Sequence, residues 1–231
     1  MATLHLIRHG QASFGAANYD QLSETGYRQG RVLGRWQAAT QTPDAVYCGT
    51  LQRHRQTLAS MAEGAGADWD RIHGIEAGLN EFDHLAVINA WNPAWSDRSV
   101  MAKELAASGA PGKTFQKAFV AAVERWVSGN HASDYAETWD DFQVRVWQAV
   151  ENIMAASAGA KHVYAVTSGG PISVIVQRLL QLDDRKALGL NAVLANASVS
   201  RMLFSGSQQS LAVFNSFGHF EAEDPALVTY R

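Results

Sequence analysis

Arg8, His9 and Gly10 stand together near the start of the chain and combine groups that can handle phosphate. A neutral imidazole is a competent nucleophile for covalent catalysis, and a neighbouring guanidinium can form paired hydrogen bonds with phosphate oxygens. Gly10 would let the backbone approach a ligand closely, because glycine has no side chain. A histidine at the end of a strand is more often structural, so a catalytic His9 needs support from residues elsewhere in the chain.

Arg53 and Glu81 could complete such a site. Arg53 falls in the first turn of a helix predicted over 51–63, and a helix N-terminus favours anions. Arg55 is better interpreted as a solvated arginine on the surface of that helix. Glu81 lies in the loop LNEFDH, where a partly buried carboxyl near phosphate would have the raised pKa that a general acid needs at neutral pH. Taken alone, Glu81 would be interpreted as an ordinary surface carboxylate.

A third segment, AVTSGGPIS at 165–173, offers neutral hydrogen-bond donors. The hydroxyl of Ser168 could donate one hydrogen bond to a phosphate oxygen. Gly169 and Gly170 could present backbone N–H groups where a helix begins. We therefore expect Ser168 and Gly169 to bind phosphate.

The elements that must position these residues follow from the hydropathy pattern, in which short apolar runs alternate with amphipathic stretches. The pattern predicts strands over 3–7, 45–48, 71–75 and 162–167, helices over 23–39, 51–63 and 171–182, and a terminal hairpin of 201–204 with 211–214. Ser23 is a suitable N-cap for the first helix, and Gly30 and Gly34 would bring one face of it close against a sheet. Alternating strands and helices favour a mainly parallel central sheet covered on both faces, an α/β fold. Ligands then bind beyond the carboxyl ends of the strands, where 8–10 and 168–170 fall.

The stretch from 84 to 159 is predicted to be a helical insertion within a single domain of residues 1–231. Three helical stretches are separated by Asn92-Pro93 and by 109–112, and five of the seven tryptophans lie here. Aromatic residues at helical spacing usually form a core, so we predict a core, with ligand stacking as the alternative. The insertion would cover the active site and select the substrate, including any apolar or aromatic part of it.

Five segments, taken in their order along the chain, resemble motifs of the histidine phosphatase superfamily, also called phosphoglycerate-mutase-like. The matching pieces run from residue 4 to about 176: LIRHG, LSETGYRQG, VYCGTLQRHRQT, LNEFD and AVTSGGPI. The resemblance implies a three-layer αβα sandwich and phosphoryl transfer with no metal and no cofactor. His9 would carry the phosphoryl group as phosphohistidine, Arg8 and Arg53 would hold its oxygens, and Glu81 would protonate the leaving group and then help water attack.

Ser168 is the largest departure from this family, because the family pattern has a second phosphate-binding histidine there. Losing one such donor commonly costs about 10²–10³ in rate. Another histidine could supply the missing donor. His219 is the preferred candidate, followed by His54 and His84. A second departure is Gly15, where many family members carry an asparagine.

Three functions are compatible with these residues. The first is a phosphatase that hydrolyses a small phosphomonoester. The second is a catalytically weak or inactive relative that binds a phosphorylated ligand or a protein partner, and Ser168 is the feature that favours it. The third is a phosphoglycerate-type mutase, which would need a second phosphate site, whereas the basic residues after Glu81 are scattered at Arg98, Lys103 and Lys113.

Composition excludes other classes of protein. The formal net charge of −3 gives no electrostatic basis for a nucleic-acid partner. No stretch approaches the roughly 18 apolar residues of a membrane span, and the N-terminus lacks a secretory signal pattern. The single cysteine, Cys48, excludes an intrachain disulfide and suits a reducing compartment. We expect a cytoplasmic protein that acts on a small phosphorylated substrate.

Overall fold

The computed structural model describes residues 1–13, 20–69 and 73–230. Gly15, and the first part of the strand expected over 71–75, lie outside these residues. The chain divides into two compact units. Unit 1 consists of Met1–Glu81 and Arg145–Arg231, and unit 2 consists of Phe82–Val144.

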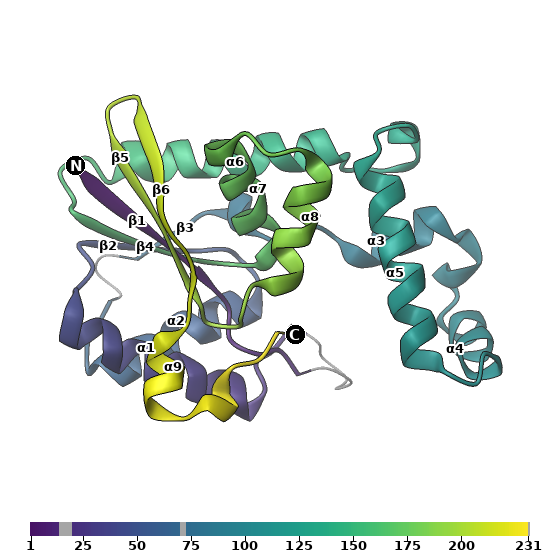
Figure 1. The fold of residues 1–231 in the computed structure, drawn as a ribbon, viewed down its shortest axis with the longest axis horizontal. Coiled ribbons are helices and arrows are strands. Elements are labelled where there is room, and N and C mark those ends of the chain that lie inside the picture. The colour runs from purple at the N-terminus through teal and green to yellow at the C-terminus, as the bar shows by residue number, and fades with distance from the viewer. Residues whose placement is uncertain (14–19, 70–72, 231) are drawn as a thin grey trace. The chain divides into compact units, whose positions relative to one another are not determined.

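Unit 1 is built on a six-stranded sheet with the strand order β3-β2-β4-β1-β5-β6 (Figure 1). Four strands run parallel: β1 (Ala2–Arg8), β2 (Ala45–Cys48), β3 (His73–Ile75) and β4 (His162–Thr167). The C-terminal hairpin adds β5 (Val199–Ser205), antiparallel to β1, and β6 (Gln208–Ser216), antiparallel to β5. The sheet is therefore mixed and mostly parallel, as the alternating pattern predicted.

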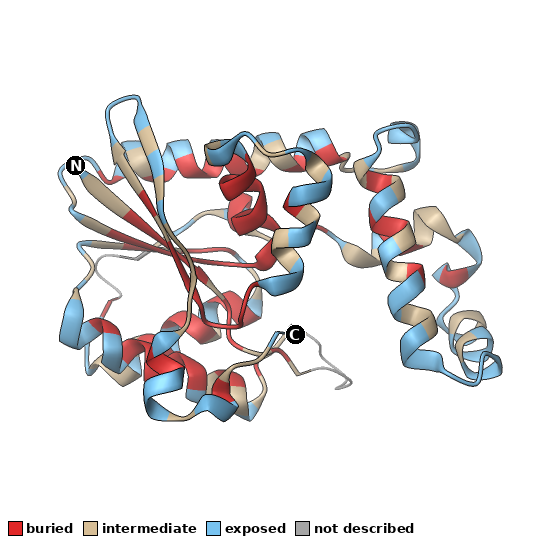
Figure 2. Ribbon diagram, in the orientation of Figure 1, coloured by how far each residue is buried: buried red, intermediate tan, exposed pale blue. Residues whose placement is uncertain are grey.

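Helices cover both faces of this sheet, so unit 1 is a three-layer αβα sandwich. One face carries α1 (Glu24–Thr40), α2 (Gln52–Ala65) and α9 (Gly218–Glu223), and the other carries α6 (Trp139–Ala156), α7 (Gly169–Leu180) and α8 (Asp184–Val193) (Figure 1). The central strands are buried along most of their length (Figure 2), because parallel strands covered on both faces read as nearly continuous apolar runs. Two short 3₁₀ helices, η2 (Ala77–Leu79) and η5 (Pro225–Leu227), complete the unit.

The start of α1 agrees with the sequence prediction. The hydroxyl of Ser23 accepts a hydrogen bond from the Gly26 N–H at 3.1 Å, and Glu24 lies in the first turn, where a carboxylate is favourable. Gln29, which has no exposed surface, accepts from the backbone N–H of Gln11 at 2.7 Å and donates to the Leu227 carbonyl at 2.7 Å. Helix α1 is thus tied to the loop that follows β1.

The glycines of α1 face α2, which corrects the expectation that they would face the sheet. A Cβ added at Gly34 would overlap the Met61 carbonyl oxygen, and one at Gly30 would lie 2.6 Å from the Ser60 Cβ. On α2 the relation is reciprocal, since a Cβ at Gly64 would overlap the Arg31 carbonyl. Bare backbone on both helices is what lets α1 and α2 approach this closely.

Unit 2 is helical and has an aromatic core, as predicted. It contains α3 (His84–Trp91), α4 (Arg98–Ala107), α5 (Pro111–Val127), the 3₁₀ helices η3 (Pro93–Ser96) and η4 (Ala132–Asp134), and the first residues of α6. The ring of Trp126 lies 4.8 Å from that of Phe82, 5.2 Å from Trp139 and 5.6 Å from Phe142. These tryptophans form the core of their own unit.

Three details of the helical prediction need correction. The third stretch expected within 84–159 is two helices, because α5 ends at Val127 and Gly129 follows with φ of 69° in the left-handed region that glycine favours. Helix α6 passes from unit 2 into unit 1, so the compact helical unit ends at Val144. Helix α8 was not anticipated, since only Ala187 in it is buried and its apolar pattern is weak. Within the described ranges, no helix has both the length and the apolar character needed to cross a membrane.

Replacing Gly34 with alanine tests the close approach of α1 and α2. The added methyl group should cost about 1–3 kcal/mol through overpacking, although alanine has the higher helix propensity. For a chain of this size, each kcal/mol lowers the melting temperature by about 2–4 °C. Thermal unfolding followed by circular dichroism measures the change.

Gly189→Ala is the matched control. Gly189 lies on the exposed side of α8, and an added Cβ there meets nothing within 4 Å. Its stability should stay the same or rise by up to about 1 kcal/mol. Equal destabilisation of both variants would show that steric contact with α2 is not the reason for glycine at position 34.

Candidate active site

The parallel strands end at one edge of the sheet, and the predicted site residues follow those ends. His9 comes directly after β1 and Ser168 directly after β4. Arg53 lies in the first turn of α2, which follows β2, and Glu81 follows η2 beyond β3. The topology thus gathers residues that are up to 159 positions apart in the chain, from His9 to Ser168, as expected for an open parallel sheet.

The backbone around His9 is held on three sides. The His9 N–H donates to the Thr167 carbonyl at 2.8 Å, and the His9 carbonyl accepts from the Ala197 N–H at 3.2 Å. The Gly10 N–H donates to the Thr57 hydroxyl at 3.0 Å. A Cβ at Gly10 would lie 2.6 Å from the Gly26 carbonyl oxygen, so packing against α1 is the steric reason for glycine here. A close approach of Gly10 to a ligand stays a prediction.

The imidazole of His9 has a defined tautomer. Its Nδ1 lies 2.7 Å from the Gly10 carbonyl oxygen, which can only accept, so Nδ1 carries a hydrogen and donates. The remaining nitrogen, Nε2, then holds a lone pair whenever the ring is neutral. Burial, followed by the charges of Arg53 and Arg8, lowers the pKa of His9 well below its usual value. His9 is therefore neutral near pH 7, with a nucleophilic lone pair on Nε2.

Two guanidinium groups flank this imidazole. Arg53 is 8% exposed, and its Nη1 forms an ion pair with Asp20 Oδ1 at 2.7 Å. Asp20 also accepts from the Gln52 N–H at 2.8 Å, so it ties Arg53 to the start of α2. Arg8 is partly buried and its Nη1 donates to the Leu194 carbonyl. Arg55 is exposed on α2, as interpreted from the sequence. Positive charge next to a buried neutral ring suits a small anion.

Glu81 lies at the N-terminus of α7. Its Oε2 accepts a hydrogen bond from the Gly170 N–H at 3.1 Å. The loop before it is fixed by the Thr167 hydroxyl, which donates to the Leu79 carbonyl at 2.6 Å, and by Arg145 Nη1, which donates to the Asn80 carbonyl at 3.0 Å. The carboxyl group of Glu81 is therefore held at the same edge of the sheet as His9.

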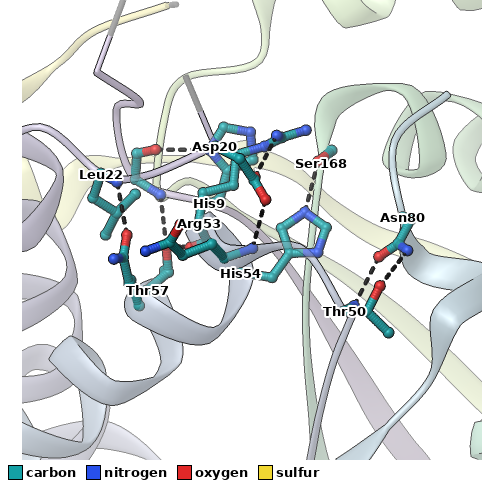
Figure 3. Close-up of polar contacts among 12 residues, drawn as sticks. His9, Asp20, Leu22, Thr50, Arg53, His54, Thr57, Asn80 and Ser168 are labelled. Atoms are coloured by element: carbon teal, nitrogen blue, oxygen red, sulfur yellow. Dashed lines mark hydrogen bonds and ion pairs between the residues drawn. The ribbon is translucent and has the colours of Figure 1, made fainter. Parts of the chain in front are cut away.

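Ser168 is bound to a histidine that comes from α2. His54 Nε2 lies 2.7 Å from Ser168 Oγ, and neither residue has exposed surface (Figure 3). The His54 ring also lies 5.7 Å from the His9 ring, between centroids, at an interplanar angle of 33°. The neighbouring Gly169 is next to Arg8, since a Cβ on it would lie 3.7 Å from Arg8 Nε. The structure thus brings His9, His54 and Ser168 together.

His219 lies in a different environment. Its ring stacks on Trp36 of α1, with 5.4 Å between ring centroids, and lies tilted against Phe220, with 4.1 Å between ring centroids. Burial lowers the pKa of His219 to about 4. His54, the second candidate from the sequence, is the histidine that contacts Ser168. His84 is the first residue of α3 and belongs to unit 2.

Four supporting residues were missed in the sequence: Asp20, Thr57, Arg145 and Asn196. Asn196 Nδ2 donates to the His9 carbonyl at 3.3 Å. Thr57 lies within the VYCGTLQRHRQT segment, and Asp20 lies two residues before the LSETGYRQG segment. A search of these segments for a partner of Arg53 would have found Asp20, and a search for a partner of Gly10 would have found Thr57. Arg145 and Asn196 lie in stretches without a motif, so only the fold reveals them. Among the described residues, no group of three or more histidine, cysteine or acidic side chains could hold a metal ion.

Comparison with solved structures defines the fold. The chain is similar to phosphoglycerate mutase from Bacillus anthracis str. Sterne, with 17% identity, a TM-score of 0.65 and 95% of each chain covered. It is also similar to a phosphoserine phosphatase mutant from Entamoeba histolytica, with 16% identity, a TM-score of 0.64 and 95% of this chain and 99% of that chain covered. Alpha-ribazole phosphatase from Shigella flexneri matches at 19% identity and a TM-score of 0.62 over 93% of this chain and 96% of that chain. The fold is therefore phosphoglycerate-mutase-like.

The family follows from the sequence itself. The model of the histidine phosphatase superfamily (branch 1) matches residues 4–89 and 103–216. The chain belongs to the histidine phosphatase superfamily. A search of curated proteins found none that matches this chain.

Buried neutral histidines should make the stability depend on pH. Burial lowers the pKa of His5 to about 3 and that of His219 to about 4, below the usual 6.5. Below pH 6.5 the unfolded chain binds protons that the folded chain does not bind. Stability is therefore fully present above about pH 6.5 and falls as the pH is lowered toward the folded-state pKa values. Urea unfolding at pH 7 and pH 5 measures the loss.

His219→Gln isolates one contribution, because glutamine does not titrate. Between pH 7 and pH 5 this variant should lose roughly 1–2 kcal/mol less unfolding free energy than the wild type. Equal losses in the two proteins would mean that His219 is not a buried neutral group.

Proposed function

We propose that this protein is a phosphatase that hydrolyses a small phosphomonoester through a phosphohistidine on His9, without a metal ion. The observation that carries the proposal is the state of His9. Its Nδ1 donates to the Gly10 carbonyl, its Nε2 holds a lone pair, and burial, followed by the charges of Arg53 and Arg8, lowers its pKa. A ring in this state is a nucleophile in a positively charged site, which is what attack on a phosphate ester requires.

In the first step, His9 Nε2 attacks phosphorus. A bond forms between nitrogen and phosphorus, and the bond between phosphorus and the ester oxygen breaks. Glu81 gives its proton to the departing oxygen, so the product leaves as a neutral alcohol. Arg8 and Arg53 bind the phosphoryl oxygens, and this charge stabilisation together with positioning supplies most of the rate. The raised pKa that this role requires of Glu81 stays a prediction.

In the second step, water attacks the phosphohistidine. Glu81, now a carboxylate, accepts a proton from the water, and the nitrogen–phosphorus bond breaks to release inorganic phosphate. His9 returns to its neutral tautomer, because the Gly10 carbonyl keeps the hydrogen on Nδ1. The enzyme is thereby restored with no added reactant except water.

The substrate class is supported by two features. Solved structures with this fold include a phosphoserine phosphatase and an alpha-ribazole phosphatase, which are named for small phosphorylated molecules. Arg98, Lys103 and Lys113 are exposed on unit 2 and scattered along its sequence, which favours a hydrolase over a mutase. We propose that unit 2 selects the substrate.

A binding protein without turnover is the second candidate, and the serine at 168 favours it. Against it stand the tautomer of His9 and the fixed carboxylate of Glu81, because a protein that only binds phosphate needs neither a nucleophile nor an acid. Gly169, next to Arg8, would contribute to phosphate binding in either case.

His9→Ala tests the proposal directly. Wild-type protein should release p-nitrophenol from p-nitrophenyl phosphate in the presence of EDTA, and His9→Ala should lose at least about 10³ of that rate because the nucleophile is gone. Rapid acid-free quenching with radiolabelled substrate should trap a phosphoenzyme in the wild type that is stable to base and labile to acid. No turnover of a broad panel of phosphate esters would reject the enzyme and favour the binder.

Arg53→Ala and Arg55→Ala form a matched pair on one helix. Arg53 is buried beside His9, so its loss should lower kcat/KM by about 10²–10³. Arg55 is exposed two residues away, and its loss should change kcat/KM by less than about threefold, since exposed charges act weakly. Similar losses in the two variants would contradict a phosphate-binding role specific to Arg53.

A further inference from the structure

The hydroxyl of Ser168 does not cap the helix that begins after it. Ser168 is the N-cap residue of α7, and a serine there normally accepts a hydrogen bond from an N–H of the first turn. No such bond is present, and the Gly170 N–H donates to Glu81 instead. Ser168 Oγ is engaged with His54 Nε2 at 2.7 Å. Helix α7 therefore has no side-chain cap, and the Ser168 hydroxyl is hydrogen-bonded to the His54 imidazole instead.

Space for the His54 ring depends on a glycine at the end of β2. A Cβ at Gly49 would overlap His54 Nδ1 and would lie 2.5 Å from Asn80 Oδ1. Figure 3 shows Ser168 and Asn80 on different sides of the His54 ring. Three segments thus accommodate one imidazole: the end of β2, the first turn of α2 and the end of β4.

The hydrogen-bond pattern also assigns the tautomer of His54. Its Nδ1 is buried and has no hydrogen-bond partner among the described residues. An unpaired buried N–H is costly, so the hydrogen belongs on Nε2, where it is donated to Ser168 Oγ. Burial and then the charge of Arg53 lower the pKa of His54, which keeps the ring neutral. A neutral ring can lie beside His9 without adding a further charge to the site.

We propose that His54 and Ser168 form a positioning pair for His9, in which Ser168 fixes the His54 imidazole and that imidazole supports the ring of His9 and the adjacent Arg53. The rings of His54 and His9 lie 5.7 Å apart between centroids, and His54 directly follows Arg53 in the first turn of α2. One helical turn therefore presents both a guanidinium and an imidazole to the nucleophile. The pair deepens the proposed function and rests on it.

The pair also accounts for serine at 168. The family resemblance led us to expect a histidine there, and an imidazole does lie beside His9, but it comes from α2 instead of from the end of β4. Positions 54 and 168 would then be interchangeable as the source of that imidazole. Moving the histidine from position 54 to position 168 can therefore test whether the imidazole positions His9 or only fills space.

The experiment compares six variants with the wild type on p-nitrophenyl phosphate. His54→Ala and Ser168→Ala should each lower kcat by about 10–100-fold with little change in KM, by analogy with residues that orient a reacting group through one contact. The double variant should lose no more than the worse single variant, because the two residues act as a unit. Thermal unfolding confirms that each variant is folded.

The exchange variant, His54→Ala combined with Ser168→His, should have a kcat at least about tenfold higher than that of His54→Ala alone. His54→Ala combined with Ser168→Leu fills similar space without an imidazole and should recover none. Recovery with leucine as well as with histidine, or additive losses in the double variant, would overturn the pair. A large loss in His219→Ala together with none in His54→Ala would do the same.

Failure of the pair and failure of the proposed function give different results. If His9-dependent hydrolysis is present but His54→Ala and Ser168→Ala retain full kcat, only the pair is wrong. If the wild type hydrolyses nothing, the pair is judged by the ring resonances of His9 in NMR spectra. Those resonances should shift in both His54→Ala and Ser168→Ala, and unchanged resonances would overturn the pair.

Discussion

The hydrogen bond from His9 Nδ1 to the Gly10 carbonyl decides what the rest of the site can do. It leaves the lone pair on Nε2. The hydrogen bond raises the pKa of His9, but burial and the two guanidinium groups lower that pKa by more, so the ring stays neutral. Were the tautomer reversed, the same arginines would surround a ring with no nucleophilic nitrogen to offer to the phosphate. The hydrogen bond is local, between neighbouring residues, so it survives only if the turn at His9 and Gly10 is held rigidly. The bonds from His9 N–H to Thr167 and from Gly10 N–H to Thr57 provide that rigidity.

Much of the fold could be predicted from the sequence because its signals are local. Apolar runs such as Thr3–Ile7 and the cap at Ser23 specify their own elements, and the alternation of strands and helices then specifies a mostly parallel sheet. The edge where the site lies follows from that topology. The break after Val127 and helix α8 were missed because a glycine in the left-handed region and a weak apolar face leave little trace in hydropathy.

The partners of the site residues were harder to predict, for a physical reason. Arg53 could be assigned to a phosphate site from its place at a helix start, but its ion pair with Asp20 depends on the path of a loop from a different part of the chain. The same holds for His54. A sequence shows that a histidine follows Arg53, yet only the fold shows that the ring faces Ser168, 114 positions away, and not solvent. His219 was preferred on equally reasonable grounds, but its ring packs between Trp36 and Phe220.

Close contacts at glycines hold the loop after His9 against α1, and α1 against α2. Gly10 meets Gly26 on α1, and Gly30 and Gly34 of α1 meet α2, the helix that carries Arg53 and His54. At Gly10 and Gly34 the facing atoms belong to the backbone, and at Gly30 they include the short side chain of Ser60, so there is little in these contacts that can rearrange when a ligand enters. A site built in this way is organised before the substrate arrives, and the reorganisation that a phosphate would demand of flexible side chains is largely avoided. The tight glycine contacts are therefore part of what holds His9 and Arg53, the proposed nucleophile and its proposed phosphate-binding partner, in place.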